Sequence, residues 1–255
     1  MDMNKLLRIA TFAGKIMLES GAETYRVEET ICRICYSFGV KEANSFVTPT
    51  GIMVSISDDN KTYSLINRVT SRSVDLNKID KINDLSRTIQ NEHMDLNDVL
   101  ETLKTIDNGE RYSFPITLIF SALAAGAFSV LFGGHFYDFL AATFIGLIIK
   151  SMSTKFQKLS INDFFTNCIG GAIAASITVF FVFLGFNIHI DKTIIGAIML
   201  LVPGLAITNA IRDTIAGDFL SGITKGAEAF LIAISIAVGT GAVLSFWINV
   251  LGGTM

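Results

Sequence analysis

Cysteine is scarce in this sequence, and its three copies exclude a disulfide framework. Cys32 and Cys35 form a Cys-x-x-Cys pair, and Cys168 stands apart from them. The pair falls inside a run of apolar residues at helical spacing, whereas a redox pair usually follows a strand and begins a helix. A structural zinc site needs four ligands, and no second pair lies nearby. We therefore favour structural over chemical roles for the cysteines, and we expect no metal site.

Several other features of well-known protein classes are missing. Neither half of the chain has a clustered positive charge, so we expect no nucleic-acid partner. GxGxxG and P-loop spacings are absent, so we expect no cofactor. His93 is the single histidine before residue 113 and lies in a polar stretch, so no catalytic group is specified. The apolar positions near the N-terminus are interrupted by Lys5, Arg8 and Lys15, which is not the pattern of a signal peptide.

Charge is distributed unevenly and divides the chain in two. Residues 1–112 hold 31 of the 43 charged side chains, whereas residues 113–255 are mostly Ala, Gly, Ile, Leu, Val and Phe. We therefore expect a water-exposed domain over 1–112 and a membrane domain over 113–255.

The second part contains five apolar segments of about the length that crosses a bilayer, which is roughly 20 residues. They cover about 114–132, 135–151, 164–186, 193–211 and 226–249. The second is the weakest, because Asp138 lies within it. Five such segments in 143 residues leave no polar faces to cover them in water. The sequence predicts an α-helical polytopic membrane protein with five transmembrane helices and an N-terminal α+β domain.

The distribution of lysine and arginine predicts the orientation, because cytoplasmic loops are rich in them. The loops at 150–163 and 212–225 carry five such residues, and the opposite loops carry only Lys192. We expect the N-terminal domain in the cytoplasm and the C-terminus outside.

The fourth segment contains a helix breaker followed by polar residues. Pro203 and Gly204 fall near its middle, where proline removes a backbone donor. Transporters use such broken helices to bind substrate, although a packing kink is a common alternative. Asn209 and Asp213 share a helix face, and Arg212 lies beside them. We expect these residues to line a transport path, with Arg212 suited to a substrate carboxylate.

Three more acids are candidates for that path. Asp138 and Glu228 are the only acids of the second and fifth segments, and an ionisable group in lipid costs roughly 2.5–3.5 kcal/mol. Asp218 follows the polar run and fits a solvated loop equally well. Asp138, Asp213 or Glu228 could carry a coupling proton if burial raises its pKa; no feature of the sequence selects one.

The first part predicts helices and a hairpin. Apolar residues from Val27 to Phe38 recur at helical spacing and predict a helix. Glu23 lies at the start of this apolar stripe, with Arg26 three residues later. An acid at a helix N-terminus is favourable because of the helix dipole, so Glu23 has an explanation that requires no function. Residues 52–57 and 63–69 alternate around a turn and predict a β-hairpin. Arg68 and Arg72 follow and could bind an anion. Residues 75–91 and 95–107 predict two amphipathic helices, the second capped by Asp95.

Three stretches resemble the threonine/serine exporter family, in particular its split form, whose longer subunit has a cytoplasmic domain and five spans. The first is Ser20-Gly-Ala-Glu-Thr-Tyr-Arg-Val-Glu28, which contains Glu23, Arg26 and Glu28. The second is Thr48-Pro-Thr-Gly-Ile-Met-Val-Ser55, continuing to the arginines at 68 and 72. The third is Leu201-Val-Pro-Gly-Leu-Ala-Ile-Thr-Asn-Ala-Ile-Arg-Asp213 with Gly217-Asp218 and Ser221-Gly222.

The resemblance implies export of small hydrophilic metabolites across the bacterial inner membrane. Threonine and serine are the cargo it implies first, and a succinate-like dicarboxylate comes second. Long members have about twice as many spans, so a smaller second membrane subunit is implied, and a higher oligomer stays open. Our hypothesis is export driven by the proton-motive force along a path between the two subunits. A membrane-tethered hydrolase and a metabolite-sensing domain remain as alternatives.

Overall fold

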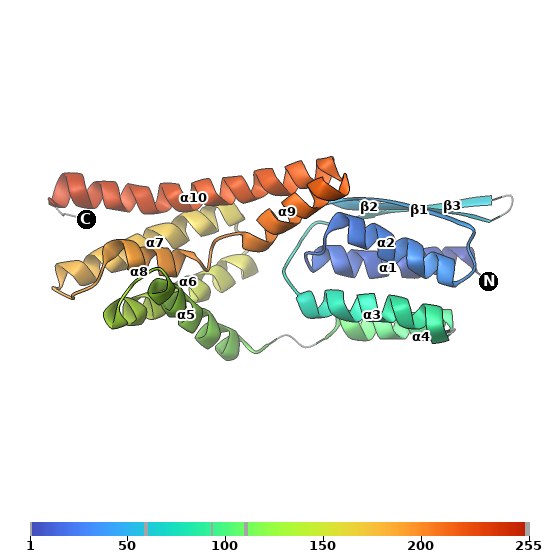
Figure 1. Ribbon diagram of the computed structural model, residues 1–255, viewed down its shortest axis with the longest axis horizontal. Coiled ribbons are helices and arrows are strands. Elements are labelled where there is room, and N and C mark those ends of the chain that lie inside the picture. Colours follow the sequence, from blue (N-terminus) through green and yellow to red (C-terminus); the bar gives the residue numbers. More distant parts are fainter. Residues whose placement is uncertain (1, 59–60, 93, 110–111, 253–255) are drawn as a thin grey trace. The chain divides into compact units, whose positions relative to one another are not determined.

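The computed structural model describes residues 2–58, 61–92, 94–109 and 112–252; His93 lies outside them (Figure 1). The chain forms two compact units. The first contains Met1–Glu110 and Gly204–Ala227, and the second contains Arg111–Pro203 and Glu228–Met255. The first unit thus takes in a segment from each of the two domains that the sequence predicts.

Helices supply most of the first unit. They are α1 (Met3–Glu19), α2 (Thr24–Ser37), α3 (Leu76–Glu92), α4 (Leu96–Asp107), α9 (Gly204–Ala216) and the first nine residues of α10 (Phe219–Leu251). Asp2 caps α1 by accepting from the amides of Asn4 and Lys5. Asp95 caps α4 through the amide of Asn97, as the sequence predicts.

A three-stranded antiparallel sheet completes this unit, in the order β1 (Glu42–Thr48), β2 (Gly51–Asp58) and β3 (Lys61–Arg68). The predicted hairpin is confirmed as β2 and β3, and β1 is an addition that the sequence analysis did not identify. Figure 1 shows α1 and α2 between the sheet and the α3–α4 pair. Alternate residues of β2, such as Ile52, Val54 and Ile56, are buried, which gives the sheet an apolar inner face.

The first unit has an extended apolar core of the kind found in soluble domains. Its fully buried side chains come from every layer and include Leu6, Ile31, Ile52, Ile82 and Leu103. These residues recur at helical or strand spacing, so burying one face of each element assembles the core.

The second unit differs, because many of its large apolar side chains are exposed, and glycine and alanine are frequent among its buried residues. It consists of α5 (Phe114–Leu131), α6 (Phe136–Lys158), α7 (Asp163–Phe183), α8 (Ile190–Ile198) and α10 from Glu228 onward. Phe120, Leu131 and Phe183 are 67–74% exposed. A Cβ on Gly196 would lie 2.6 Å from Cβ of Ser129, so α8 and α5 approach closely, as helices do in lipid.

Within the described residues, four helices are long and apolar enough to cross a membrane: α5, α6, α7 and α10. The predicted segment at 193–211 differs, because it is not one helix. α8 ends at Ile198, residues 199–203 are not helical, and α9 begins at Gly204. Pro203 explains the break, since it has no amide to continue the ladder and disfavours helix in the residue before it.

Two other helices are longer than their predicted spans. α6 continues to Lys158, so Lys150, Lys155 and Lys158 lie on its last turns and not in a loop. Lys155 and Lys158 lie in the last turn, where cations interact favourably with the negative end of the helix dipole. α10 begins at Phe219, seven residues before the predicted span.

Candidate functional site

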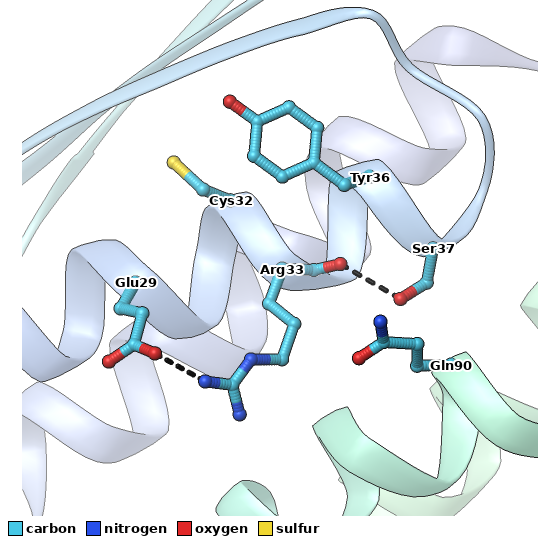
Figure 2. Close-up of a pocket in the computed structure, with 6 residues that line it drawn as sticks. All are labelled: Glu29, Cys32, Arg33, Tyr36, Ser37 and Gln90. Carbon is cyan, nitrogen blue, oxygen red and sulfur yellow. Dashed lines mark hydrogen bonds and ion pairs between the residues drawn. The ribbon is translucent and has the colours of Figure 1, made fainter.

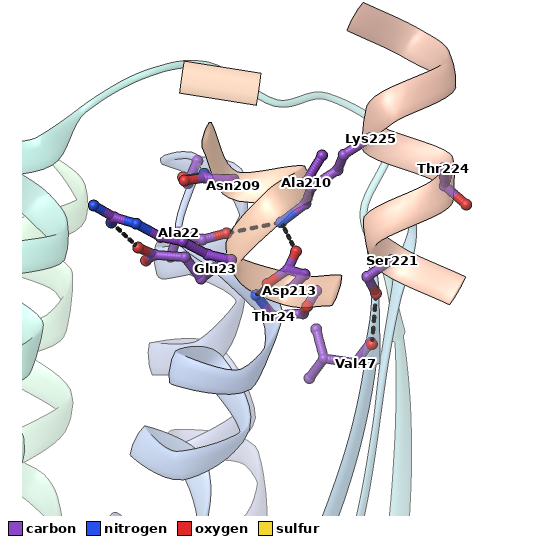
Figure 3. A network of polar contacts seen from close by, with 12 residues as sticks. Ala22, Glu23, Thr24, Val47, Asn209, Ala210, Asp213, Ser221, Thr224 and Lys225 are labelled. Atoms are coloured by element: carbon purple, nitrogen blue, oxygen red, sulfur yellow. Dashed lines mark hydrogen bonds and ion pairs between the residues drawn. The ribbon is translucent and has the colours of Figure 1, made fainter. Parts of the chain in front are cut away.

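A buried polar cluster in the first unit joins the turn between α1 and α2 to the α9–α10 hairpin (Figure 3). We call it the interlock. Its members are Gly21, Ala22, Glu23 and Thr24 of the turn, Asn209, Arg212 and Asp213 of α9, and Ser221 and Lys225 of α10. Most of these polar side chains are buried, and the guanidinium of Arg212 is the main exception.

Asp213 is the centre of the interlock and is fully buried. Its Oδ1 accepts a hydrogen bond from the amide of Thr24 (3.0 Å), and its Oδ2 accepts one from Nζ of Lys225 (2.8 Å). Thr24 is the first residue of α2, whose first-turn amides lack partners within the helix. A residue of another helix therefore caps α2, and its carboxylate is stabilised by the positive end of the dipole and by an ammonium.

Glu23 forms the second ion pair. It is the residue before α2, but its side chain makes no capping bond and instead binds Arg212. Arg26 lies 3.7 Å from its other oxygen. Burial raises the pKa of the Glu23 carboxyl, but the hydrogen bonds from the backbone and Arg212 and the charges of both arginines outweigh it, so the net shift is downward. The same hydrogen bond raises the pKa of Arg212.

Backbone carbonyls of the turn accept the remaining donors. Nδ2 of Asn209 donates to the carbonyl of Gly21 (2.8 Å), and Nζ of Lys225 donates to that of Ala22 (3.2 Å). Gly21 adopts φ +89°, a conformation that favours glycine, and a Cβ there would lie 3.0 Å from the carbonyl oxygen of Ser73. The turn is therefore fixed by the conformation of Gly21 and by three side chains of the hairpin. Asn209, Lys225 and Arg212 each donate a hydrogen bond to it.

The end of β1 extends the cluster. Oγ of Ser221 lies 3.5 Å from the carbonyl of Val47, and the amide of Val47 donates to the Glu28 carboxylate (2.7 Å). Burial raises the pKa of Glu28, the bond from Val47 opposes this, and the carboxylates of Asp218 and Asp213 add to the rise. Burial and the charge of Asp213 likewise raise the pKa of Asp218, and the charge of Lys225 opposes this rise.

The chemistry of the interlock is that of paired opposite charges. Arg212 and Lys225 are donors suited to a carboxylate, and Glu23 and Asp213 are acceptors suited to an ammonium group. In this structure each of these groups binds another part of the protein. The arrangement can recognise a small molecule that carries both charges if one of these pairs exchanges its partner.

The predicted site residues fall into four places. Asn209, Arg212, Asp213 and Glu23 meet in the interlock, with Arg26, Glu28 and Asp218 beside it. Pro203 and Gly204 lie at the break before α9, and Arg68 and Arg72 are exposed at the end of β3 and in the loop after it. Asp138 and Glu228 belong to the second unit, where Asp138 is fully buried and Glu228 partly so.

Lys225 is the member that sequence reasoning misassigned. It counts as a loop cation in the orientation argument, yet it lies on α10 and is 5% exposed. The signal was present, because Lys225 is the sole lysine or arginine of α10, a helix that is mostly apolar. A cation in that position needs a buried partner.

A separate cavity of about 530 Å³ lies on the first unit, where α2 faces Gln90 of α3 (Figure 2). Its lining is polar and includes the ion pair of Glu29 with Arg33, together with Cys32, Tyr36, Ser37 and Gln90. None of these residues belongs to the interlock.

A family model described as "Putative threonine/serine exporter" matches residues 8–247. The chain belongs to the threonine/serine exporter family. Members of this family are transporters, so the hydrolase alternative is dropped, and with its apolar helices the chain is an integral membrane protein. Members of the interlock fall in or beside the first and third of the stretches that carry the family resemblance, and Val47, which contacts Ser221, directly precedes the second.

Individual relatives of the exporter family are distant in sequence. The chain is 19% identical to the "Probable succinate transporter subunit YjjP" of Klebsiella aerogenes over 96% of this chain and 95% of that one. It is 21% identical to the Escherichia coli protein of the same name, over 94% of both. It is 24% identical to the "Threonine/serine exporter" of Corynebacterium glutamicum over 92% of this chain but only 50% of that one. No solved structure matches.

Proposed function

We propose that the chain is one subunit of a two-subunit exporter of small hydrophilic metabolites in the bacterial inner membrane. Its residues 1–112 form a cytoplasmic domain, its C-terminus lies outside, and its partner is a smaller membrane protein of the same family. Threonine- and serine-type amino acids are the first choice of cargo, and a succinate-like dicarboxylate is the second.

The need for a partner is supported by length. The chain spans half of the Corynebacterium exporter and nearly all of two proteins whose names call them transporter subunits. We infer that a second chain supplies the half of the Corynebacterium protein that this chain does not cover.

The interlock is the observation that carries the proposal. We infer that cargo enters by replacing the ion pair between Glu23 and Arg212, since the Arg212 side chain is 55% exposed. The carboxylate of an amino acid would bind Arg212 and its ammonium would bind Glu23, so charge stays balanced throughout the exchange. Breaking and remaking this pair would also release and refasten the α9–α10 hairpin, which gives a physical basis for a gate.

The same pairing favours an amino acid over a dicarboxylate. Succinate would satisfy Arg212 with one carboxylate, but its second negative charge would face Glu23 or Asp213. Like charges at such close range repel, and more strongly where water is excluded. Threonine and serine avoid this repulsion and add a hydroxyl that can donate or accept a hydrogen bond.

Substitution of Arg212 tests the proposal. Arg212→Gln should abolish export at normal membrane levels, and Arg212→Lys should lower it, because lysine keeps the charge but lacks the bidentate fork. Arg87→Gln on α3 is the matched control, since it removes an exposed arginine of the same unit outside the interlock. Export by Arg212→Gln at the wild-type rate would refute the role of this pair.

A second candidate function for the first unit is metabolite sensing, and the cavity of Figure 2 favours it. Its volume lies within the range of small-molecule sites. Calorimetry of the purified full chain with threonine distinguishes the two sites: binding lost in Arg33→Gln supports sensing at the cavity, and binding lost in Arg212→Gln but kept in Arg33→Gln refutes it.

A further inference from the structure

A second buried carboxylate, Asp138, organises one end of the second unit. Its Oδ1 accepts the amide of His189 (2.6 Å) and the hydroxyl of Thr193 (3.1 Å), and its Oδ2 accepts the amide of His135 (2.7 Å). Nδ1 of the His189 ring lies 2.9 Å from the same Oδ2. Asp138 is fully buried and binds the residues that precede both α6 and α8.

Helix capping alone does not account for this arrangement. The two amides and the hydroxyl already satisfy the carboxylate, and they would do so with any residue at position 189 that has a backbone amide. The structure adds an imidazole, held by its Nδ1 and 47% exposed. The ring of His135 packs edge-on against it, with ring centroids 5.1 Å apart.

The chemistry of the pair is that of an oriented proton acceptor. A carboxylate beside Nδ1 selects the tautomer that carries its proton there, so Nε2 keeps its lone pair. A hydronium ion can then transfer its proton to Nε2 and leave as water. The resulting imidazolium is stabilised by the buried negative charge of Asp138, in the same way that a carboxylate supports the histidine of a catalytic triad.

The ring of His189 lines a cavity of about 830 Å³. His189 and Asp191 line it together with apolar side chains of α8, such as Ile194 and Ile198. The residues of α7 and α10 that line it, Val182, Thr240 and Leu244, are not ionisable.

Few other charges face the pair. In the described segments 132–138 and 184–192, the ionisable groups besides Asp138 and His189 are His135, Tyr137 and the Asp191–Lys192 pair (3.0 Å), which is neutral as a whole. α5, which packs on both α6 and α8, has no ionisable side chain. Protonation of His189 therefore changes a site with one net negative charge into a neutral one.

We propose that His189, held by Asp138, is the site at which the exporter accepts protons from outside the cell. The proposal rests on the proposed function, because the orientation derived from lysine and arginine puts the 184–192 loop outside. Inward movement of protons down their gradient would then drive cargo outward, and His189 would be the first group in this chain to bind them.

His189→Asn is the test variant, because its amide can still donate to Asp138 but cannot take up a proton. Lys158→Gln is the matched control, because it removes an exposed cation at the end of α6 opposite Asp138, outside the proposed site. In cells that express this chain with its partner, wild-type export should rise several-fold as the external pH falls from about 8 to 5, the range in which histidine ordinarily changes charge.

His189→Asn should lose this response and Lys158→Gln should keep it. A wild-type response to external pH in His189→Asn would overturn the proposal while leaving the exporter function intact.

A readout that needs no cargo separates the two claims. Histidine-labelled full-length protein in lipid nanodiscs is titrated by NMR, and His189→Asn identifies the ring signal. We expect the ring signal of His189 to report the gain of a proton as the pH is lowered, and Asp138→Asn to change that response. A ring that keeps one protonation state throughout would overturn the proposal, even if every cargo assay succeeds. Absence of export by wild type would count against the proposed function alone.

Discussion

Replacing Lys225 with methionine tests whether the interlock holds the α9–α10 hairpin to the rest of the first unit. Methionine keeps the length and apolar stem of lysine but removes the ammonium that lies 2.8 Å from Oδ2 of Asp213. Asp213 is fully buried and Lys225 is 5% exposed, so water cannot replace the lost partner without an opening of the structure. Breaking a buried pair in this way costs about 3–5 kcal/mol.

The expected effect is largest at the amides that the pair protects. At about 1.4 kcal/mol for each factor of ten, the loss corresponds to roughly 100-fold to several-thousand-fold faster hydrogen exchange, if these amides exchange through opening of the interlock. Exchange of the full chain in nanodiscs, read by mass spectrometry, should show this at the start of α2, where the amide of Thr24 binds Asp213.

Two further variants serve as controls for Lys225→Met. Lys104→Met removes an ammonium that lies 3.7 Å from Glu101 in an exposed pair, and should cost about 0–1 kcal/mol. Asp213→Asn with Lys225→Met should recover much of the loss, because no buried charge stays uncompensated. If Lys225→Met changes exchange no more than Lys104→Met does, the buried ion pair does not hold the hairpin and the reasoning fails.

Three other predictions concern the first unit. Gly21→Ala should lower the melting temperature of this unit more than Gly39→Ala does. Both glycines have positive φ, but a Cβ on Gly21 would crowd a carbonyl oxygen, whereas no described atom lies within 4 Å of a Cβ on Gly39. Equal shifts in melting temperature would contradict this. Burial raises the pKa of Cys35 to about 12, so a maleimide at neutral pH should label Cys35 only after unfolding. Labelling of Cys35 itself in the native protein would count against its burial. The pKa of Glu28 in the folded protein is raised above 4.5, so its contribution to stability should fall as the pH rises from 4.5 through the folded pKa. Thermal unfolding of Glu28→Gln should lack this trend, and a pH profile identical to that of wild type would refute the prediction.

Local features of the fold were predictable because they depend on neighbouring residues. Alternation predicted β2 and β3, Asp95 predicted the start of α4, and Pro203 predicted the break before α9. β1 was harder, because Glu42–Thr48 is short and mostly polar, and only its pairing with β2 defines it.

Partners in the site were not predictable, since they depend on tertiary contacts. Arg212 and Asp213 were selected as functional from their position after the break, but Glu23 and Thr24, which they bind, are 189 residues away. Asp138 was likewise selected as the lone acid of its segment, and its ring partner His189 lies 51 residues on. The sequence thus indicates which residues need partners, and the tertiary structure identifies those partners.

The central claim is tested most directly by efflux from cells loaded with labelled threonine, serine and succinate. The cells express this chain alone, or with a membrane protein that matches the half of the Corynebacterium exporter not covered here. The account predicts efflux only with both chains in the membrane, with threonine and serine ahead of succinate. Efflux by this chain alone would contradict the two-subunit assignment, and no efflux of any of the three with both chains present would contradict the proposed function.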